Sequence, residues 1–98
     1  MFVVVQHTLI DPPTAFARGE RLKRGEDAPH ASRVLQFYPS QDGKLVTCLW
    51  ESDSVADVQA YVDETLGDAS LNLCYVVEAT AAFAESPTGI AERPAVPA

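Results

Sequence analysis

The chain has 98 residues, enough for one domain, and 47% of them are hydrophobic. Its 14 Asp and Glu against 7 Lys and Arg give a net charge of −7, which excludes nucleic-acid binding as the expected function, because phosphate recognition needs a basic surface. No apolar run reaches the roughly 18–20 residues of a membrane helix, and the N-terminus lacks the basic region and cleavage site of a signal peptide, so we expect a cytoplasmic protein without membrane contact.

The first half of the chain predicts a strand, a helix and a second strand. Residues 2–9 are rich in β-branched side chains, which favour strands. Asp11 followed by two prolines is typical of a helix start, and the helix is expected to end near Arg24, just before a glycine. A polar loop then leads into a strand at residues 33–38.

The second half predicts a strand, a stronger helix and a last strand. Turn-forming residues at 39–43 indicate a hairpin that continues into a strand at 44–51. Ser54 is a good N-cap, and apolar residues follow it at helical spacing. Gly67 is expected to end this helix in the left-handed conformation, and residues 71–78 form the last strand.

This order of elements predicts an α+β fold of the ferredoxin-like βαββαβ type. Right-handed crossovers give a four-stranded antiparallel sheet in the order 4-1-3-2, with two helices on one face. The two central strands are apolar on both faces, yet the helices cover only one of them. We therefore expect a second copy to cover the other face, as a homodimer that forms a dimeric α+β barrel. The domain spans residues 1–85, and the Pro- and Ala-rich residues 86–98 form a tail.

The two cysteines are expected to stay reduced. Cys48 and Cys74 lie in strands that are not neighbours in this order, whereas a disulfide needs Cα atoms within about 7 Å. We expect both to be small buried hydrophobic residues, as in a cytoplasmic protein.

Charges are unevenly divided between the two helices. Four of the seven basic residues fall within residues 18–24, whereas acidic residues gather at 53–68. If the helices lie side by side, these charges complement each other. The alternative is a site for an anionic ligand on the basic segment.

The sheet face away from the helices is expected to line a pocket against the partner sheet. Alternation turns Val3 and Val5 toward the helices and leaves the opposite side mixed, and apolar bodies with polar groups at one end are typical of ligand pockets. The residues expected at its mouth are Gln6, Thr8, Gln36, Tyr38 and Glu51, with Val34 on the same side. For the last strand, the sequence leaves open whether Asn72 or Tyr75 faces this pocket.

His7 and Glu51 are the candidate catalytic residues, because each lies near an end of a central strand. If they are close, Glu51 can orient the imidazole and raise its basicity, which makes His7 a general base. The alternative is a histidine bonded to a local backbone group and a glutamate stabilised by the following helix. Neither metal-ligand spacing nor a nucleotide-binding or serine-hydrolase motif is present, so we expect no metal and no cofactor.

Several segments resemble a known family. They are Asp42-Gly43 between two strands, the run Cys48-Leu49-Trp50-Glu51, the helix start Ser54-Val55, the opening His7-Thr8 with Asp11-Pro12, and the later Gly67, Ser70, Asn72 and Tyr75. Over residues 2–83 the chain is similar to small ferredoxin-like bacterial proteins, most of them classified only as a domain of unknown function, with one branch described as nickel-binding. The resemblance implies a dimeric α+β barrel with a pocket near Gln6, His7, Glu51, Asn72 and Tyr75.

Together these patterns predict a cytoplasmic homodimer of unknown activity that binds a small, partly apolar ligand between its sheets. One alternative, by analogy of fold, is a cofactor-free cyclase, isomerase or monooxygenase. In that enzyme His7 or Glu51 is the base, and Tyr75 or Asn72 holds a developing oxyanion. The other alternative, implied by the resemblance, is a nickel-binding protein.

Overall fold

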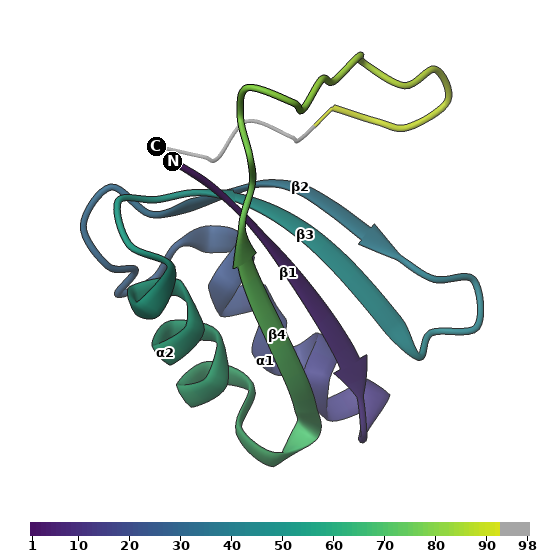
Figure 1. Cartoon of the computed structure of the whole chain (residues 1–98). Helices are drawn as coiled ribbons and strands as arrows, with labels where there is room; N and C mark the ends of the chain where they lie inside the picture. The colour runs from purple at the N-terminus through teal and green to yellow at the C-terminus, as the bar shows by residue number, and fades with distance from the viewer. Residues whose placement is uncertain (93–98) are drawn as a thin grey trace.

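The computed structural model describes residues 1–92 and contains the six regular elements that the sequence predicts, in the predicted order (Figure 1). The elements are β1 (Phe2–Leu9), α1 (Pro12–Arg24), β2 (Arg33–Pro39), β3 (Leu45–Glu51), α2 (Val55–Leu66) and β4 (Ser70–Val76), with a short 3-10 turn, η1 (Gly67–Ala69), before the last strand.

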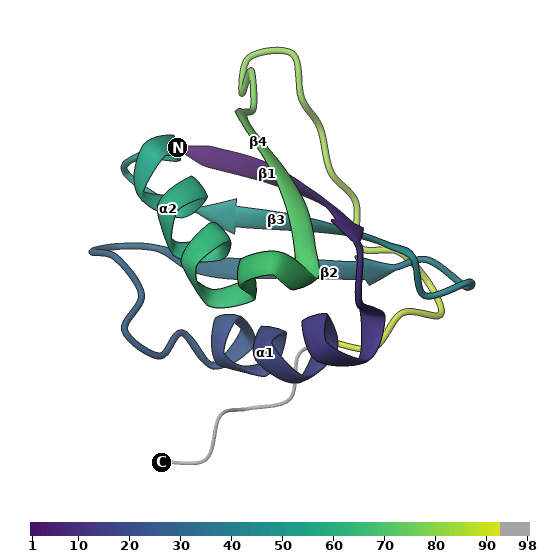
Figure 2. The same cartoon turned by 90° about the horizontal axis from the view of Figure 1, so that it is seen from below.

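The four strands form one antiparallel sheet in the order β2-β3-β1-β4. This is the predicted order 4-1-3-2 counted from the other edge, so the ferredoxin-like α+β fold is confirmed. Both helices lie on the same side of the sheet, and its other side carries no helix (Figure 2).

The core lies between the sheet and the two helices. Val3 and Val5 of β1 point into it, as predicted, and they stand opposite Trp50 and Cys48 of β3. On the helix side, the core contains Val58 of α2 and the apolar residues that follow it at helical spacing. Burying this one apolar face is the main force that holds helices and sheet together.

Val34 is an exception to the predicted alternation. The sequence placed it with Gln36 and Tyr38 on the mixed face, but it is buried in the core opposite Trp50. The cause is a β-bulge between Val34 and Gln36, where one extra residue of β2 has no partner on β3. A bulge shifts the alternation by one residue, so the two sides of β2 change faces at this point.

The register also settles the alternation of β4, which the sequence left open. Asn72 lies opposite His7 and Cys74 opposite Val5, so both belong to the helix face. Tyr75 lies opposite Val4 and belongs to the open face.

The cysteines are unpaired, as expected. Cys48 and Cys74 flank the same residue, Val5, from the two sides of β1. Two strand spacings separate them by about 9–10 Å, which is too far for a disulfide.

Both helices begin at the predicted caps. The Asp11 carboxylate accepts a hydrogen bond from the Thr14 backbone N–H, and the Ser54 hydroxyl accepts one from the Asp57 N–H at 3.1 Å. Gly67 has the expected positive φ of 55°, but its ψ of −133° lies outside the left-handed helical region. The reason is that the chain continues directly into η1 instead of forming a conventional helix stop.

One charged residue of α1 reaches the end of the other helix. The Nη1 atom of Arg18 donates to Leu66 O, at the end of α2, at 2.9 Å and to the Asp68 carboxylate of η1 at 3.1 Å. The other three basic residues of this segment make ion pairs within α1 or with the loop that follows it.

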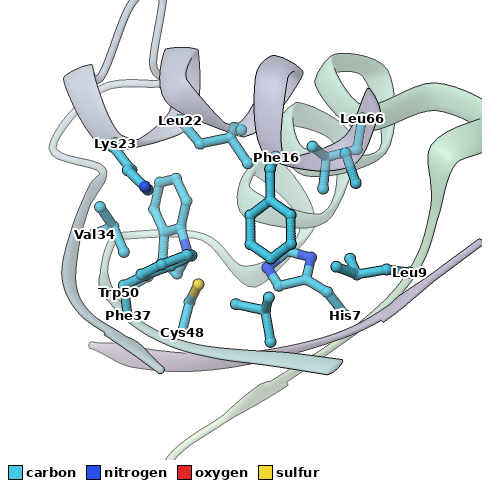
Figure 3. Close-up of a pocket in the computed structure, with 13 residues that line it drawn as sticks. His7, Leu9, Phe16, Leu22, Lys23, Val34, Phe37, Cys48, Trp50 and Leu66 are labelled. Atoms are coloured by element: carbon cyan, nitrogen blue, oxygen red, sulfur yellow. The ribbon is translucent and has the colours of Figure 1, made fainter. Parts of the chain in front are cut away.

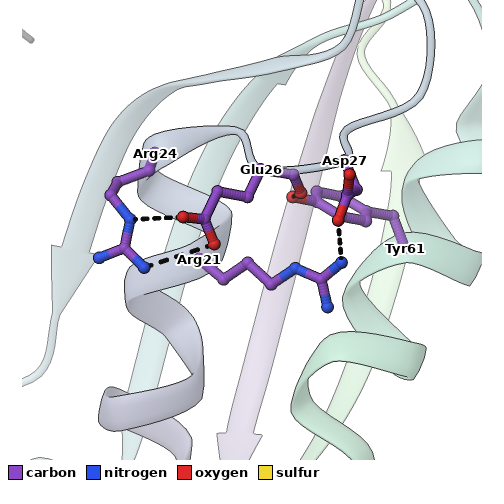
Figure 4. A network of polar contacts seen from close by, with 5 residues as sticks. All are labelled: Arg21, Arg24, Glu26, Asp27 and Tyr61. Atoms are coloured by element: carbon purple, nitrogen blue, oxygen red, sulfur yellow. Dashed lines mark hydrogen bonds and ion pairs between the residues drawn. The ribbon is translucent and has the colours of Figure 1, made fainter.

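The local pairs instead hold the loop after α1 (Figure 4). Arg21 bonds Asp27 at 2.7 Å, and Arg24 bonds Glu26. From α2, the buried Tyr61 donates its hydroxyl to the backbone carbonyl of Glu26. These contacts fix the path of the chain from α1 to β2.

After β4, residues 77–92 form no helix or strand and are mostly exposed. Part of the predicted tail, residues 93–98, lies outside the described residues. Within residues 1–92, no helix has both the length and the apolar character needed to cross a membrane.

Candidate functional site

The structure separates the predicted site residues onto the two faces of the sheet. Six of them belong to the open face, namely Gln6, Thr8, Gln36, Tyr38, Glu51 and Tyr75. His7 and Asn72 lie on the helix face, directly opposite each other on β1 and β4.

The two candidate catalytic residues lie at opposite ends of the sheet. His7 is opposite Val46, whereas Glu51 is opposite Phe2, five residues farther along β1. At the spacing of a strand this is about 17 Å, so Glu51 cannot orient the imidazole. Glu51 instead lies 3.7 Å from the exposed guanidinium of Arg33.

A different carboxylate reaches His7, through an amide. The Nδ1 atom of His7 lies 2.6 Å from Oδ1 of Asn72. The Asn72 Nδ2 group in turn donates to the carboxylate of Asp63 on α2 at 2.9 Å. The three side chains therefore form one hydrogen-bonded row, Asp63–Asn72–His7, from the surface of α2 into the core.

This row determines which nitrogen of the imidazole carries the proton. A carboxylate only accepts hydrogen bonds, so the Asn72 amide must turn its NH₂ group to Asp63 and its oxygen to His7. The oxygen then accepts from Nδ1–H of His7, and Nε2 of the neutral ring is left as an acceptor.

The Asn72 amide is held from further directions. Its Oδ1 also accepts from the Ser70 hydroxyl at 2.8 Å, and its backbone carbonyl accepts from the side-chain amide of Gln59 at 3.0 Å. Gln59 in addition donates to both oxygens of the Asp63 carboxylate. The position of the imidazole is therefore fixed by several partners and not by a single contact.

A half-enclosed pocket lies between α1 and the sheet, and His7 forms part of its floor (Figure 3). Its volume is about 40 Å³, roughly three times what one water molecule requires. Apart from His7 and Lys23 its lining is almost entirely apolar; it includes Leu9, Phe16, Leu22, Val34, Phe37, Val46, Cys48, Trp50 and Leu66.

The pocket exists because α1 presents small residues toward the sheet. Ala15 and Gly19 both line it, and a Cβ atom at Gly19 would meet nothing closer than a Leu66 methyl group at 4.0 Å. Its rim includes Phe16 and Phe37, which are only partly buried, and the Lys23 ammonium lies 4.3 Å from the centre of the Phe37 ring.

The indole N–H of Trp50 is a buried donor without an acceptor among the described residues. Trp50 is 1% exposed, lines the pocket and packs edge-on against Tyr61. A buried polar group with no partner costs about 1–3 kcal/mol, so such groups are rare in folded proteins and call for a specific reason. A ligand acceptor in the pocket would supply that reason.

Burial favours the neutral forms of His7 and Cys48. It lowers the pKa of His7 below the ordinary 6.5, although the hydrogen bond to Asn72 and the charge of Asp63 oppose this shift. It also raises the pKa of the Cys48 thiol to about 12. At neutral pH the pocket therefore holds a neutral imidazole and a protonated thiol, which is neither a nucleophile nor a metal ligand.

Comparison with protein-family models, with curated proteins and with solved structures finds no match. The resemblance to the small ferredoxin-like family therefore stays a prediction. Among residues 1–92, no three His, Cys, Asp or Glu side chains lie together in a way that could hold a metal ion.

The sequence analysis named His7 and Asn72 as candidates, but for a pocket on the open face, and it named neither Asp63 nor the N–H group of Trp50. An aromatic residue in an apolar strand indicates core packing, which accounts for the Trp50 ring but not for its N–H group. Two features of the sequence point to a pocket beside Trp50. Trp50 lies two residues after Cys48, on the same buried face of the strand, and the helix that covers this face carries the small residue Gly19.

Proposed function

We propose that this chain is a small homodimeric protein that binds a small, partly apolar molecule in the pocket between α1 and the sheet. The observation that carries the proposal concerns Trp50, which lines that pocket and whose buried N–H group has no partner among residues 1–92. A pocket that served only as a packing defect would be lined by groups that need no partner.

The polar groups of the lining define the chemistry of the ligand. Trp50 offers a donor, so the ligand should carry an acceptor oxygen. Nε2 of His7 offers an acceptor, which suits a ligand O–H, N–H or acidic C–H group. The rest of the lining is apolar and the volume is small, so the buried part should be a compact hydrocarbon group, such as one edge of a six-membered ring whose other edge lies at the open side of the pocket.

Phenol and cyclohexanone are suitable probes because each presents one oxygen on a six-membered ring. Trp50 is the single tryptophan, so a ¹⁵N-labelled sample gives one indole N–H signal. We expect titration with either probe to move this signal downfield and to saturate, as a new acceptor is reached. If neither probe shifts it at millimolar concentration, the binding proposal is wrong.

Two substitutions on α1 make this experiment specific. Gly19→Leu places a side chain in the pocket and should abolish the shift, while helix propensity favours leucine over glycine. Ala17→Leu adds a similar side chain on the exposed side of the same helix and should leave binding unchanged.

The homodimer part of the proposal is supported by the open face of the sheet. Large apolar side chains stand exposed there on three strands, and they include Phe2, Leu45, Leu71, Leu73 and Tyr75. A second copy presents the same apolar face, and two sheets pack about 10 Å apart when their inner faces are apolar. Residues between the sheets would include Gln6 and Tyr38, as the sequence suggested.

A cytoplasmic location also belongs to the proposal. It is supported by two cysteines that are unpaired and too far apart to form a bridge within the chain.

A further inference from the structure

We propose that the pocket is a catalytic site for proton transfer at carbon, with His7 as the base and the Trp50 N–H as the donor to a developing oxyanion. The substrate class is a small carbonyl compound with an acidic C–H group beside the carbonyl. This inference rests on the proposed binding function, because it uses the same pocket.

The first support is the state of the imidazole. A general base needs an unprotonated nitrogen that faces its substrate and a second nitrogen that is held in place. Asn72 holds Nδ1–H, and Nε2 belongs to the part of the ring that faces the pocket (Figure 3). The Asp63 carboxylate favours the protonated ring of His7, so it stabilises the imidazolium that forms when Nε2 takes a proton.

The second support is that the acceptor and the donor line one water-poor pocket. His7 and Trp50 lie on adjacent strands, with Cys48 between them along β3. An N–H donor that is already desolvated needs no reorganisation when negative charge develops on a substrate oxygen. The unpaired N–H group of Trp50 lowers the stability of the protein alone, but it lowers the free energy of the transition state by donating to the oxyanion.

The step is balanced without any co-reactant. The lone pair of Nε2 forms a new N–H bond while the C–H bond beside the carbonyl breaks. The electron pair of that bond becomes the C=C bond of an enolate, and the carbonyl π pair moves to oxygen, where it accepts the Trp50 N–H. In a β,γ-unsaturated ketone this enolate is a dienolate. The oxyanion pair then re-forms the C=O bond, the pair between the carbonyl carbon and Cα becomes the Cα=Cβ bond, and the Cβ=Cγ pair takes the proton from Nε2 at Cγ. The double bond has moved into conjugation, and neutral His7 is regenerated.

The charged and titratable groups around His7 agree with these roles. Asp63 on α2 is the anion of the row, Cys48 on β3 stays a neutral thiol, and Lys23 on α1 lies at the rim with its ammonium 3.1 Å from Glu20. Cys74 on β4 is also protonated at neutral pH, because burial raises its pKa to about 11. Asp63 is therefore the group that sets the charge environment of the base.

The isomerisation of β,γ-cyclohexenone to its conjugated isomer tests the proposal, because the product absorbs in the ultraviolet. We expect the protein to accelerate this reaction and His7→Gln to lower kcat/KM by about 100-fold or more, the usual contribution of a general base. Trp50→Phe keeps an aromatic ring without the N–H donor and should lower kcat/KM by about 100-fold.

Phenol binding, measured on the same variants by saturation-transfer NMR, separates the two proposals. If phenol binds the native protein and His7→Gln but β,γ-cyclohexenone turns over equally in both, the catalytic proposal is overturned and binding survives. If phenol binds neither, the proposed pocket function fails as well.

Asp63 and Asn72 are positioning residues, and a pH profile tests their role. The Asp63 charge raises the pKa of His7, so Asp63→Asn should move the acid limb of the kcat/KM profile to lower pH and reduce its plateau. Glu64→Gln removes a neighbouring charge of α2 and should leave the profile in place. If the acid limb of the kcat/KM profile stays in place in Asp63→Asn, the Asp63–Asn72–His7 row does not determine the basicity of His7.

Discussion

His7 is a polar residue in an otherwise apolar core, and its burial depends on Asn72. The imidazole is 4% exposed and stands next to Val5 on the same strand face. A buried ring nitrogen without a partner would cost free energy, and Asn72 supplies the partner for Nδ1. The same burial favours the neutral ring, because an imidazolium in this core loses its hydration.

This preference predicts a pH dependence of stability. The unfolded chain binds a proton at His7 near pH 6.5, whereas the folded chain binds it only at lower pH. Between these two pKa values the unfolded state holds more protons, so the free energy of unfolding rises with pH. The contribution of His7 is therefore complete above pH 6.5 and is lost as the pH falls below it.

Urea unfolding from about pH 7.5 down to about pH 5.5 measures this effect, because exposed carboxylates titrate mostly below that range. The native midpoint should fall on acidification, and His7→Gln should flatten the curve. His30→Gln changes an exposed histidine and serves as the control. Equal slopes for His7→Gln and the native chain would show that His7 is not the group responsible.

The position of His7 could be predicted from the sequence, but its partner could not. Once Val3 and Val5 are assigned to the core, strict alternation also places His7 there. Asn72 needed the register between β1 and β4, which no local pattern determines. Asp63 needed in addition the rotation of α2 above the sheet, which follows from packing of whole elements.

The exposed edge of β4 is protected by a side chain of α2. An edge strand leaves backbone groups unpaired, and these can pair with another chain. Gln59 occupies two of them: its Oε1 accepts from the Cys74 N–H at 3.2 Å, and its Nε2 donates to the Asn72 carbonyl at 3.0 Å. The side-chain amide thus imitates the next strand of the sheet.

We predict that Gln59→Ala loosens this edge. Two backbone hydrogen bonds are lost and water replaces them in part, so the free energy of unfolding should fall by about 1 kcal/mol. Hydrogen exchange at the Cys74 amide should accelerate relative to the amides of β1. Gln41→Ala, at an exposed position of the hairpin, should change neither quantity, and a Cys74 amide that stays equally protected would refute the edge role.

The positions of the helices and strands could be predicted from the sequence better than which of their residues point to the core. Capping residues such as Ser54 act within one turn, so sequence alone located the helix starts. The bulge in β2 arises where the edge strand must follow β3 and still bury Val34 opposite Trp50. The bulge is therefore a requirement of the folded sheet. Residues 33–38 contain no glycine or proline that would predict it from the sequence.

The described part of the molecule has two layers, one of helices and one of strands, and the outer face of the strand layer is left without cover. Two helices bury one face of the sheet, and the other face remains apolar, with Leu73 60% and Leu71 65% exposed. Residues 77–92, the described part of the C-terminal segment, leave these side chains exposed, and among them Phe83 is 93% exposed. The sheet is about 20 Å by 25 Å, so one face offers an area comparable to a small stable interface once side chains are included.

A charge in the middle of this open face should therefore prevent dimerisation. Leu73 lies opposite Gln6 on the central strand β1, and Leu73→Lys would place an ammonium between the two apolar sheets, where desolvation is costly. We expect the native chain to sediment at twice its mass of 10.6 kDa and Leu73→Lys at the mass of one chain, still folded by circular dichroism. Ile10→Lys and Phe83→Lys change apolar residues that are at least as exposed as Leu73 but lie away from the sheet face, and both variants should remain dimeric. A native chain that sediments as a monomer at all concentrations would contradict the dimer, whereas dissociation by Phe83→Lys would move the interface to the C-terminal segment.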